Sequence, residues 1–202
     1  MVSLRFMEKK SSISVGKYNS LRVARMVDFG AYLDGGDMGD ILMPKKYLPD
    51  NVEVGNNIDA FIYRDSEDRL IATTEKPFAV VGEFAFLKVK TVTQHGAFLD
   101  WGLLKDLLVP YREQRSRMNV DESYIVYIFL DSNSGRIAAT EKYNKYLDNL
   151  APKYEQGEEV NILICEQTPL GYKAIINNTH TGIIYNSEVH RRLSIGEKTK
   201  AY

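Results

Sequence analysis

The chain has 202 residues, of which 44% are hydrophobic and 26% charged, and its formal net charge at pH 7 is −1. This composition is that of a folded protein with room for one to three small domains, and the near-neutral charge excludes a strong, diffuse attraction to phosphate backbones. No apolar run reaches the roughly 18 residues of a membrane helix. The single cysteine, Cys165, excludes an intramolecular disulfide and a multi-cysteine metal site. We therefore expect a cytoplasmic protein.

Residues 1–15 lack the apolar core of a signal peptide and predict a flexible N-terminal tail. A first domain is expected at 16–77, with Gly30 marking a bulge or a sharp bend in its second strand and one helical turn within 45–54. Apolar and alternating segments predict its five short strands at 21–27, 32–33, 41–43, 58–63 and 70–74. Five short strands with a long connection after the third are typical of a small closed β-barrel of the OB type.

The segment Phe-Gly-Ala-Tyr-Leu-Asp at 29–34 recurs as His-Gly-Ala-Phe-Leu-Asp at 95–100. The same spacing relates 40–44 to 106–110 and 71–76 to 137–142, and three blocks at one spacing indicate a duplicated unit. We expect a second barrel at 81–146, held in a fixed relation to the first by the short link 77–80. Its predicted strands are 86–92, 97–100, 107–109, 124–130 and 136–140.

A degenerate third copy is expected at 154–202, after a polar connector that begins at Tyr143. Its predicted strands are 157–164, 171–176, 181–185 and 195–202, and Tyr172 stands in the aromatic region of the second of them. The chain ends within the fourth strand, and an open barrel leaves unpaired strand edges, so we expect a truncated barrel from a longer protein. The predicted fold is all-β: tandem five-stranded OB-type barrels, the third incomplete.

These blocks resemble the S1-type RNA-binding motif, with its glycine-led first strand, its aromatic-Gly-Ala-aromatic second strand and its closing Asp and Arg. Their tandem order is similar to the conserved virulence factor B (YitL-like) family, whose members have three such domains followed by a winged helix. The resemblance implies a bacterial RNA-binding protein linked to virulence-gene regulation. No nucleophile–base pair, metal cluster or phosphate loop stands out in the sequence, so we expect no enzymatic activity, no cofactor, no small-molecule substrate and no membrane partner.

Single-stranded RNA is bound with little sequence preference where aromatic faces stack on bases and cations follow the backbone. In the motif, the two aromatic side chains lie on the exposed barrel face, the arginine contacts phosphate or stacks, and the aspartate accepts hydrogen bonds. The RNA-contact residues that the resemblance implies are Phe29, Tyr32, Asp65 and Arg69 in the first copy and His95, Phe98, Asp131 and Arg136 in the second.

The connection after the third strand is basic in every copy. If the barrels align, these side chains could form a broken cationic track for phosphates; the alternative is a solvated charged face. The residues are Lys45 and Lys46, then Arg112, Arg115 and Arg117, then Arg191 and Arg192.

Several features leave alternatives open. Met43 and Val109 replace the motif's third-strand histidine and cannot donate a hydrogen bond. Trp101 could be an exposed contact or could pack between barrels. The segment 34–40 has three aspartates, but it lacks the spacing of an EF-hand calcium loop, which favours a turn.

The charge of the first copy favours a different function. From residue 16 to 80, Lys and Arg number 8 against 11 Asp and Glu, a net charge of −3, whereas residues 81 to 150 have 9 of each. A domain with net negative charge favours the binding of proteins over the binding of RNA. The alternative is therefore a protein-interaction scaffold with vestigial RNA binding, whose partners would be components of the ribosome or of RNA polymerase.

Overall fold

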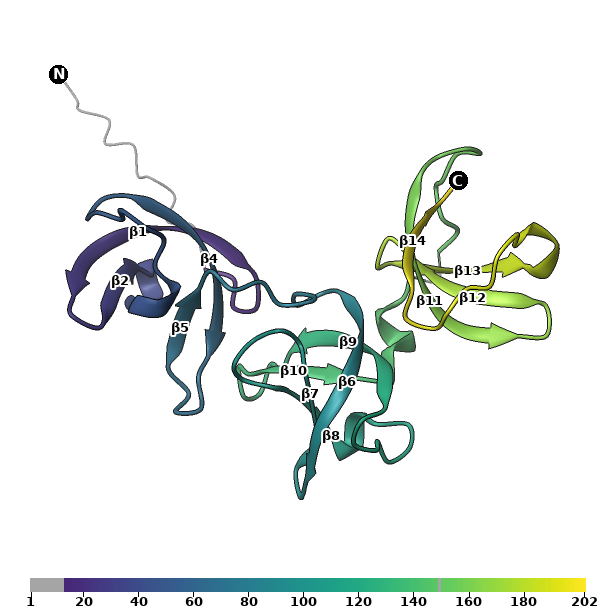
Figure 1. Cartoon of the computed structure of the whole chain (residues 1–202), viewed down its shortest axis with the longest axis horizontal. Helices are drawn as coiled ribbons and strands as arrows, with labels where there is room; N and C mark the ends of the chain where they lie inside the picture. Colours follow the sequence, from purple (N-terminus) through teal and green to yellow (C-terminus); the bar gives the residue numbers. More distant parts are fainter. Residues whose placement is uncertain (1–12, 149) are drawn as a thin grey trace. The chain divides into compact units, whose positions relative to one another are not determined.

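The computed structural model describes residues 13–148 and 150–202, which form β-strands and short 3-10 helices (Figure 1). The chain divides into two compact units, one ending at Lys76 and the other beginning at Pro77. Within the described ranges, no helix has the length and apolar character to cross a membrane. The all-β prediction is confirmed.

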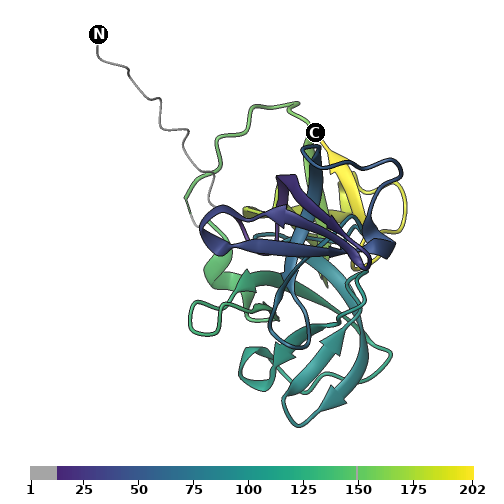
Figure 2. The same cartoon turned by 90° about the vertical axis from the view of Figure 1, so that its left-hand side faces the viewer.

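The first unit is a closed five-stranded barrel in the order β1-β2-β3-β5-β4, seen from its own side in Figure 2. A parallel pairing of Leu42 with Ile71 closes it. Alternate residues point inward, so that Val23, Leu33, Met43 and Ile62 are fully buried. The helical turn expected after β3 is η2 (Lys45–Tyr47). The strands are β1 (Tyr18–Val27), β2 (Gly30–Asp34), β3 (Asp40–Pro44), β4 (Asn57–Arg64) and β5 (Leu70–Thr73), with η1 (Gly36–Met38) before β3.

The second unit begins with a five-stranded sheet in the order β10-β9-β6-β7-β8, whose outer strands β8 and β10 lie in contact, so that the barrel is nearly closed. The link before it belongs to this unit: the backbone N–H of Phe78 donates to the carbonyl of Trp101 at 2.8 Å. The strands are β6 (Phe84–Thr93), β7 (Gly96–Leu99), β8 (Leu107–Pro110), β9 (Ser123–Leu130) and β10 (Ile137–Thr140), with η3 (Tyr111–Glu113) after β8.

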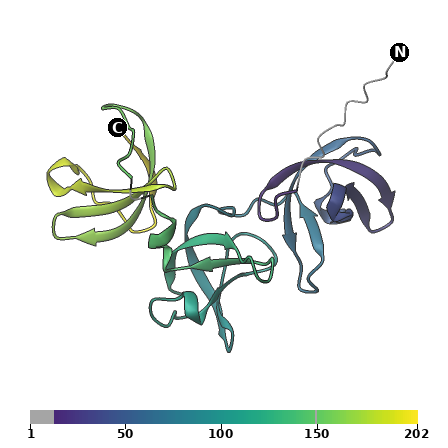
Figure 3. The same cartoon turned by 180° about the vertical axis from the view of Figure 1, so that it is seen from behind.

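The third copy is a partial barrel, a four-stranded sheet in the order β13-β12-β11-β14, shown from behind in Figure 3. Its strands pair as in the first copy: Ile162 faces Thr199 across β11 and β14, as Leu21 faces Ile58 across β1 and β4. Its elements are β11 (Val160–Thr168), β12 (Gly171–Ile176), β13 (His180–Tyr185), η5 (Asn186–Glu188) and β14 (Lys198–Ala201); η4 (Tyr143–Tyr146) belongs to the end of the second barrel.

The second barrel and the third copy share a hydrophobic cluster. Phe84, Ile125 and Tyr143 of the former pack with Leu163 and Ile175 of the latter. At the same junction, the backbone N–H of Phe84 donates to Oδ1 of Asn178 at 3.1 Å, and that of Asp148 donates to the carbonyl of Thr179 at 2.8 Å. This shared packing explains why the two form one compact unit.

Each copy has a glycine at the start of its second strand that allows close approach of the third strand. Gly30, Gly96 and Gly171 have φ values of +156°, +145° and +150°. A Cβ on any of them would lie 2.0–2.2 Å from a carbonyl oxygen of the next strand, that of Met43, Val109 or Ile184. Only glycine lets the second and third strands approach so closely.

Of the two alternatives expected at Gly30, a bulge or a sharp bend, the bulge lies instead on the strand that pairs with β2. The pairing of β1 with β2 shifts between Val23 and Arg25, and equivalent shifts occur in β6 and β11. The expectation was therefore wrong about which strand is bulged, because the glycine serves the contact with β3 and the extra residue is accommodated in β1. The shared glycines and bulges align the three copies residue by residue.

Candidate nucleic-acid interface

Two aromatic side chains lie on the outer surface of the first barrel. Phe29 precedes β2 and is 58% exposed, and Tyr32 points outward because its neighbours Ala31 and Leu33 are fully buried. The two rings meet edge to face, with centroids 6.4 Å apart. Phe29 thus presents open ring surface, and Tyr32 is half-buried beside it.

Arg25 completes this group from the neighbouring strand. It pairs with Tyr32 across β1 and β2, and its guanidinium carbon lies 3.8 Å from the centre of the Tyr32 ring. Its Nε also lies 3.3 Å from Oδ2 of Asp40. Sequence reasoning missed Arg25; the signal that could have found it is the strand register, because the bulge after Val23 places Arg25 opposite Tyr32.

The Tyr32 ring borders a hollow of about 570 Å³ on the same barrel. Leu42 of β3 and Arg64 and Arg69 at the β4–β5 turn line it together with Asp40. Pockets that bind small organic ligands have volumes in this range. Aromatic, apolar and cationic side chains therefore converge on one concave surface.

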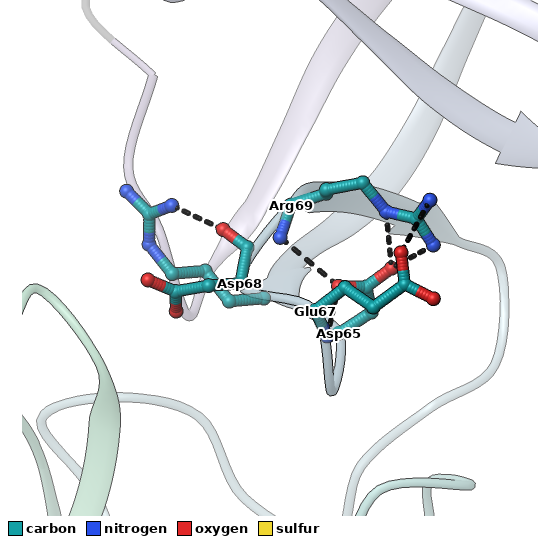
Figure 4. A network of polar contacts seen from close by, with 5 residues as sticks. Asp65, Glu67, Asp68 and Arg69 are labelled. Carbon is teal, nitrogen blue, oxygen red and sulfur yellow. Dashed lines mark hydrogen bonds and ion pairs between the residues drawn. The ribbon is translucent and has the colours of Figure 1, made fainter.

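Arg69 is held over this hollow by carboxylates (Figure 4). Its Nε and Nη2 donate to Oδ2 of Asp65 at 2.9 and 2.8 Å, and its Nη1 lies 2.8 Å from Oε2 of Glu67. Partial burial, the largest single influence, raises the pKa of Asp65, but hydrogen bonds from the Arg69 side chain and from the backbone of Arg69 and Glu67 outweigh it and lower that pKa. Asp65 therefore orients an arginine whose side chain remains 63% exposed. We call Arg25, Phe29, Tyr32 and Arg69 the first aromatic face.

The two lysines of η2 lie near this face. The backbone N–H of Lys45 donates to the carbonyl of Phe29 at 2.9 Å, which places the helical turn beside that residue. Lys46 extends over the Tyr47 ring, with Nζ 4.4 Å from its centre, and a hydrogen bond with Tyr47 raises the pKa of Lys46. Both lysines are exposed.

The second barrel repeats the framework with different side chains. His95 is exposed before β7, and Phe98 is half-buried and pairs with Leu108, as Tyr32 pairs with Leu42. A threonine, Thr91, pairs with Phe98 where Arg25 pairs with Tyr32. The neighbouring residue Lys90 forms an ion pair, with its Nζ 2.9 Å from Oδ1 of Asp106, which is the counterpart of the Arg25–Asp40 pair.

The β9–β10 turn differs from its counterpart in the first barrel. Nη2 of Arg112, from η3, lies 3.5 Å from Oδ2 of Asp131. The backbone N–H of Asn133 is the leading cause that lowers the pKa of Asp131. Arg136 is exposed at the end of the turn, and its carbonyl accepts the N–H of Asp131 at 2.9 Å.

Two segments, residues 15–75 and 81–142, match the model of the S1 domain. The chain belongs to the S1 domain family. Membership indicates a binding protein rather than an enzyme, and it supports RNA binding. The third copy lies outside the two matched segments.

Individual proteins resemble this chain as well. The uncharacterized protein YitL of Bacillus subtilis is 32% identical over 102 residues, which are 50% of this chain and 34% of that protein. A crystallised multidomain protein with nucleic acid binding domains from Streptococcus pneumoniae superposes with a TM-score of 0.55 at 18% identity, covering 92% of this chain and 67% of that one. The resemblance to tandem S1-type domains and to the YitL-like family is confirmed.

The arginines after the third strand of the second S1 domain diverge. Arg112 reaches Asp131, whereas the guanidinium of Arg115 lies 4.9 Å from the Tyr143 ring, with Nη2 3.4 Å from Oδ1 of Asn144. The guanidinium of Arg117 lies 3.7 Å from the centre of the Tyr111 ring. In the third copy, Arg191 pairs with Glu197, and Arg192 is exposed. The cationic track stays a prediction.

Three residues singled out in the sequence are buried. Met43 and Val109 are fully buried, so the outward third-strand positions of the S1 domains are their neighbours, and the expected histidine equivalence was wrong. Tyr172 is 7% exposed in the core of the third copy, because it aligns with Ala31 and not with Tyr32.

Trp101 and the acidic loop of the first S1 domain have structural roles. Trp101 is 2% exposed and its indole N–H donates to the carbonyl of Lys105 at 2.5 Å, so it is no exposed stacking surface. In the 34–40 segment, Oδ1 of Asp34 accepts the N–H of Gly36 and Asp40 pairs with Arg25, which agrees with the predicted turn. Across 13–148 and 150–202, no group of three or more metal-ligating side chains was found.

Proposed function

We propose that the chain binds single-stranded RNA on the outer faces of its S1 domains, with low sequence preference. The first aromatic face carries the proposal: an exposed Phe29 ring, a Tyr32 ring stacked with Arg25, and Arg69 beside a hollow of about 570 Å³. Bases of any kind stack on aromatic rings, and exposed guanidinium groups pair with phosphates. The domain limits expected from the sequence, 16–77, 81–146 and 154–202, belong to this proposal.

The second S1 domain would carry contacts of the same kinds on its own surface. His95 and Phe98 would supply the stacking surfaces, and Arg112 and Arg136 the phosphate contacts. Lys45, Lys46 and Arg115 would add weaker, salt-sensitive attraction. The acidic partners Asp65 and Asp131 would orient arginines and not contact bases. Membership of the S1 domain family supports RNA binding. A wider role in bacterial gene regulation, including virulence-factor expression, is part of the proposal and comes from what the resemblance to the conserved virulence factor B family implies.

Fluorescence anisotropy of a labelled mixed-sequence RNA of about 15 nucleotides, titrated at several salt concentrations, tests the proposal. Phe29→Ala and Tyr32→Ala should each weaken binding by about 1–3 kcal/mol, the cost of one lost stacking contact. Tyr18→Ala is a matched control, since Tyr18 is a partly exposed aromatic residue on the same barrel, roughly 23 Å from Arg25 along β1. Folded variants that bind RNA as tightly as the unchanged protein would contradict the proposal.

A second candidate is a protein-interaction scaffold for the ribosome or RNA polymerase. Its supporting observation is that carboxylates pair with the cations of the first aromatic face, Arg25 with Asp40 and Arg69 with Asp65 and Glu67. Such pairs reduce the positive potential that attracts RNA. An absence of RNA binding even at low salt, with retained binding to one of those protein assemblies, would favour the scaffold over the RNA-binding proposal.

A further inference from the structure

A second hollow, of about 540 Å³, lies where the third copy meets the second barrel. The start of β6 lines it from the second barrel, and β11, β12 and β14 line it from the third copy. Its volume is in the range of pockets that bind small organic molecules, and none of the proposed RNA contacts borders it. We call it the junction hollow; its lining includes Phe84, Asn161, Asn177, Asn178, Lys198 and Lys200.

The strand register explains why these side chains gather on one side of the third copy. Asn161 pairs with Lys200 and Leu163 with Lys198 across β11 and β14, and Leu163 also pairs with Ile175 of β12. Residues that pair across antiparallel strands, and residues two apart along a strand, point to the same side of a sheet. Leu163 and Ile175 belong to the cluster shared with the second barrel, so this side is the one that faces that barrel.

Two asparagines after β12 are oriented by the backbone. Oδ1 of Asn178 accepts the N–H of Phe84 at 3.1 Å, and Oδ1 of Asn177 accepts the N–H of Asn161 at 2.9 Å. A carboxamide has one acceptor oxygen and one donor NH₂ group. Because both oxygens serve the backbone, and no acceptor among the described residues bonds either Nδ2, the NH₂ groups are the donors that remain for a ligand.

The charges around the junction hollow favour an anion. Lys198 is exposed, and within 13–148 and 150–202 it has no carboxylate partner. Lys200 bonds to Glu159, which lies outside the lining. The carboxylate in the lining is Glu83, whose Oε2 accepts the N–H of Val80 at 3.0 Å and so serves its own turn. One unpaired cation and two amide donors therefore border the same space.

These polar groups are not part of the repeated barrel framework. The turn between the second and third strands has amide side chains in the third copy, whereas the corresponding connections of the first two copies contain aspartates. The β14 lysines are also particular to this copy. Lys198 and Lys200 take the places of Asn57 and Asp59 in the first barrel and of Ser123 and Ile125 in the second. Formation of the barrel does not require them, which favours a role in binding.

We propose that the junction hollow binds a small organic anion, a carboxylate or a phosphate ester, with Lys198 as its charge partner and the Nδ2 groups of Asn177 and Asn178 as hydrogen-bond donors. Such oxygens accept hydrogen bonds from ammonium and amide groups, and those to the ammonium are charge-assisted. The proposal is independent of RNA binding. A ligand in this place contacts the second barrel and the third copy together, so its binding stabilises their junction.

Nuclear magnetic resonance of the whole, ¹⁵N-labelled chain tests the proposal with two probes, citrate for carboxylates and glucose 6-phosphate for phosphate esters. At least one probe should shift the side-chain amide signals of Asn177 and Asn178 with a Kd of about 1 mM or below. The same probe should slow hydrogen exchange of the Phe84 amide, because that amide bonds Asn178 at the junction. A response to one probe alone identifies which of the two anions the hollow prefers.

Two substitutions remove the anion contacts while the fold is kept. Lys198→Gln should weaken binding at least about tenfold, the cost of one hydrogen bond to a charged group. Asn178→Asp should abolish binding: it retains an acceptor for the Phe84 N–H and suits the φ of +55°, but it replaces the donor by a negative charge. Lys153→Gln and Asn133→Asp are the matched controls, which make the same charge changes at exposed sites outside the lining.

Three outcomes would overturn the proposal. The first is the absence of saturable shifts with either probe at concentrations up to about 10 mM. The second is an unchanged affinity in Lys198→Gln and Asn178→Asp. The third is a set of shifts confined to the arginines of the first barrel, which would mean that the probes bind there as generic anions. Each outcome leaves the RNA-binding proposal intact, since none of them measures RNA.

Discussion

Arg25 occupies one side of the Tyr32 ring, and its Nε lies 3.3 Å from an Asp40 carboxylate whose side chain is 48% exposed. Exposed ion pairs of this kind contribute about 0–1 kcal/mol, so little free energy holds Arg25 in place. RNA phosphates could draw the guanidinium away from Asp40, or a base could extend the stack on the free side of Arg25. In the proposed site, Asp40 would therefore compete with RNA for the arginine.

Asp40→Asn should accordingly strengthen RNA binding, because it removes a carboxylate that both pairs with Arg25 and repels phosphate. We expect a severalfold gain in affinity at low salt that fades toward roughly 0.5 M salt, where screening shortens the range of charge interactions. Anisotropy titrations at a series of salt concentrations measure it. Asp59→Asn makes the same change in net charge at an exposed site on β4. An equal gain in both variants would show that net charge, and not the Arg25 pair, limits binding.

Strand positions in all three copies could be predicted from apolar alternation and from the repeated blocks, because burial on one side of a sheet imposes a period of two. The side to which a given residue points was harder to predict. Tyr172 directly follows the close-approach glycine and was grouped with the exposed aromatics, yet the ring position lies one residue later, at Lys173. Arg25 was missed because the bulge changes the phase of β1 halfway along the strand.

The close-approach glycines give a prediction about the strands themselves. Gly30→Ala would bring a Cβ to 2.1 Å from the carbonyl oxygen of Met43 at a φ of +156°, so β2 and β3 must separate. We expect a loss of more than about 2 kcal/mol in the free energy of unfolding. Gly39→Ala is the matched control, because Gly39 also has a positive φ, +74°, but no atom lies within 4 Å of its Cβ position. Urea denaturation of the two variants compares them. Equal losses would mean that backbone strain, and not the contact with Met43, sets the cost.

At the scale of the whole molecule, the packing is uneven: the first barrel has its own core, whereas the third copy has a core of its own and also shares a second hydrophobic cluster with the second barrel. Phe84 is central to the shared cluster, with its ring centre 4.9 Å from that of Tyr127 and 5.3 Å from that of Tyr143. The repeats predicted three similar domains, and the sequence contained no sign of this shared cluster, because Leu163 and Ile175 read as ordinary strand residues and Phe84 lies before the predicted strand 86–92.

Phe84→Ala should therefore loosen two copies at once. Removing a buried phenyl group costs about 3–5 kcal/mol, and here the cavity would open between the second barrel and the third copy. Hydrogen exchange followed by mass spectrometry should show faster exchange in β6, β9, β11 and β12, with β1 to β5 unchanged. Ile62→Ala, in the core of the first barrel, should produce the opposite pattern. Faster exchange in the second barrel with unchanged β11 and β12 would show that the third copy does not depend on this contact.

The shared cluster also bears on how the chain is made. During synthesis β6 to β10 leave the ribosome before β11 and β12, so the second barrel can form while the later strands are still being added. The apolar surface around Phe84 is then ready when Leu163 and Ile175 emerge. We expect the third copy to fold by adding its strands to an existing neighbour, so that the direction of translation favours its assembly.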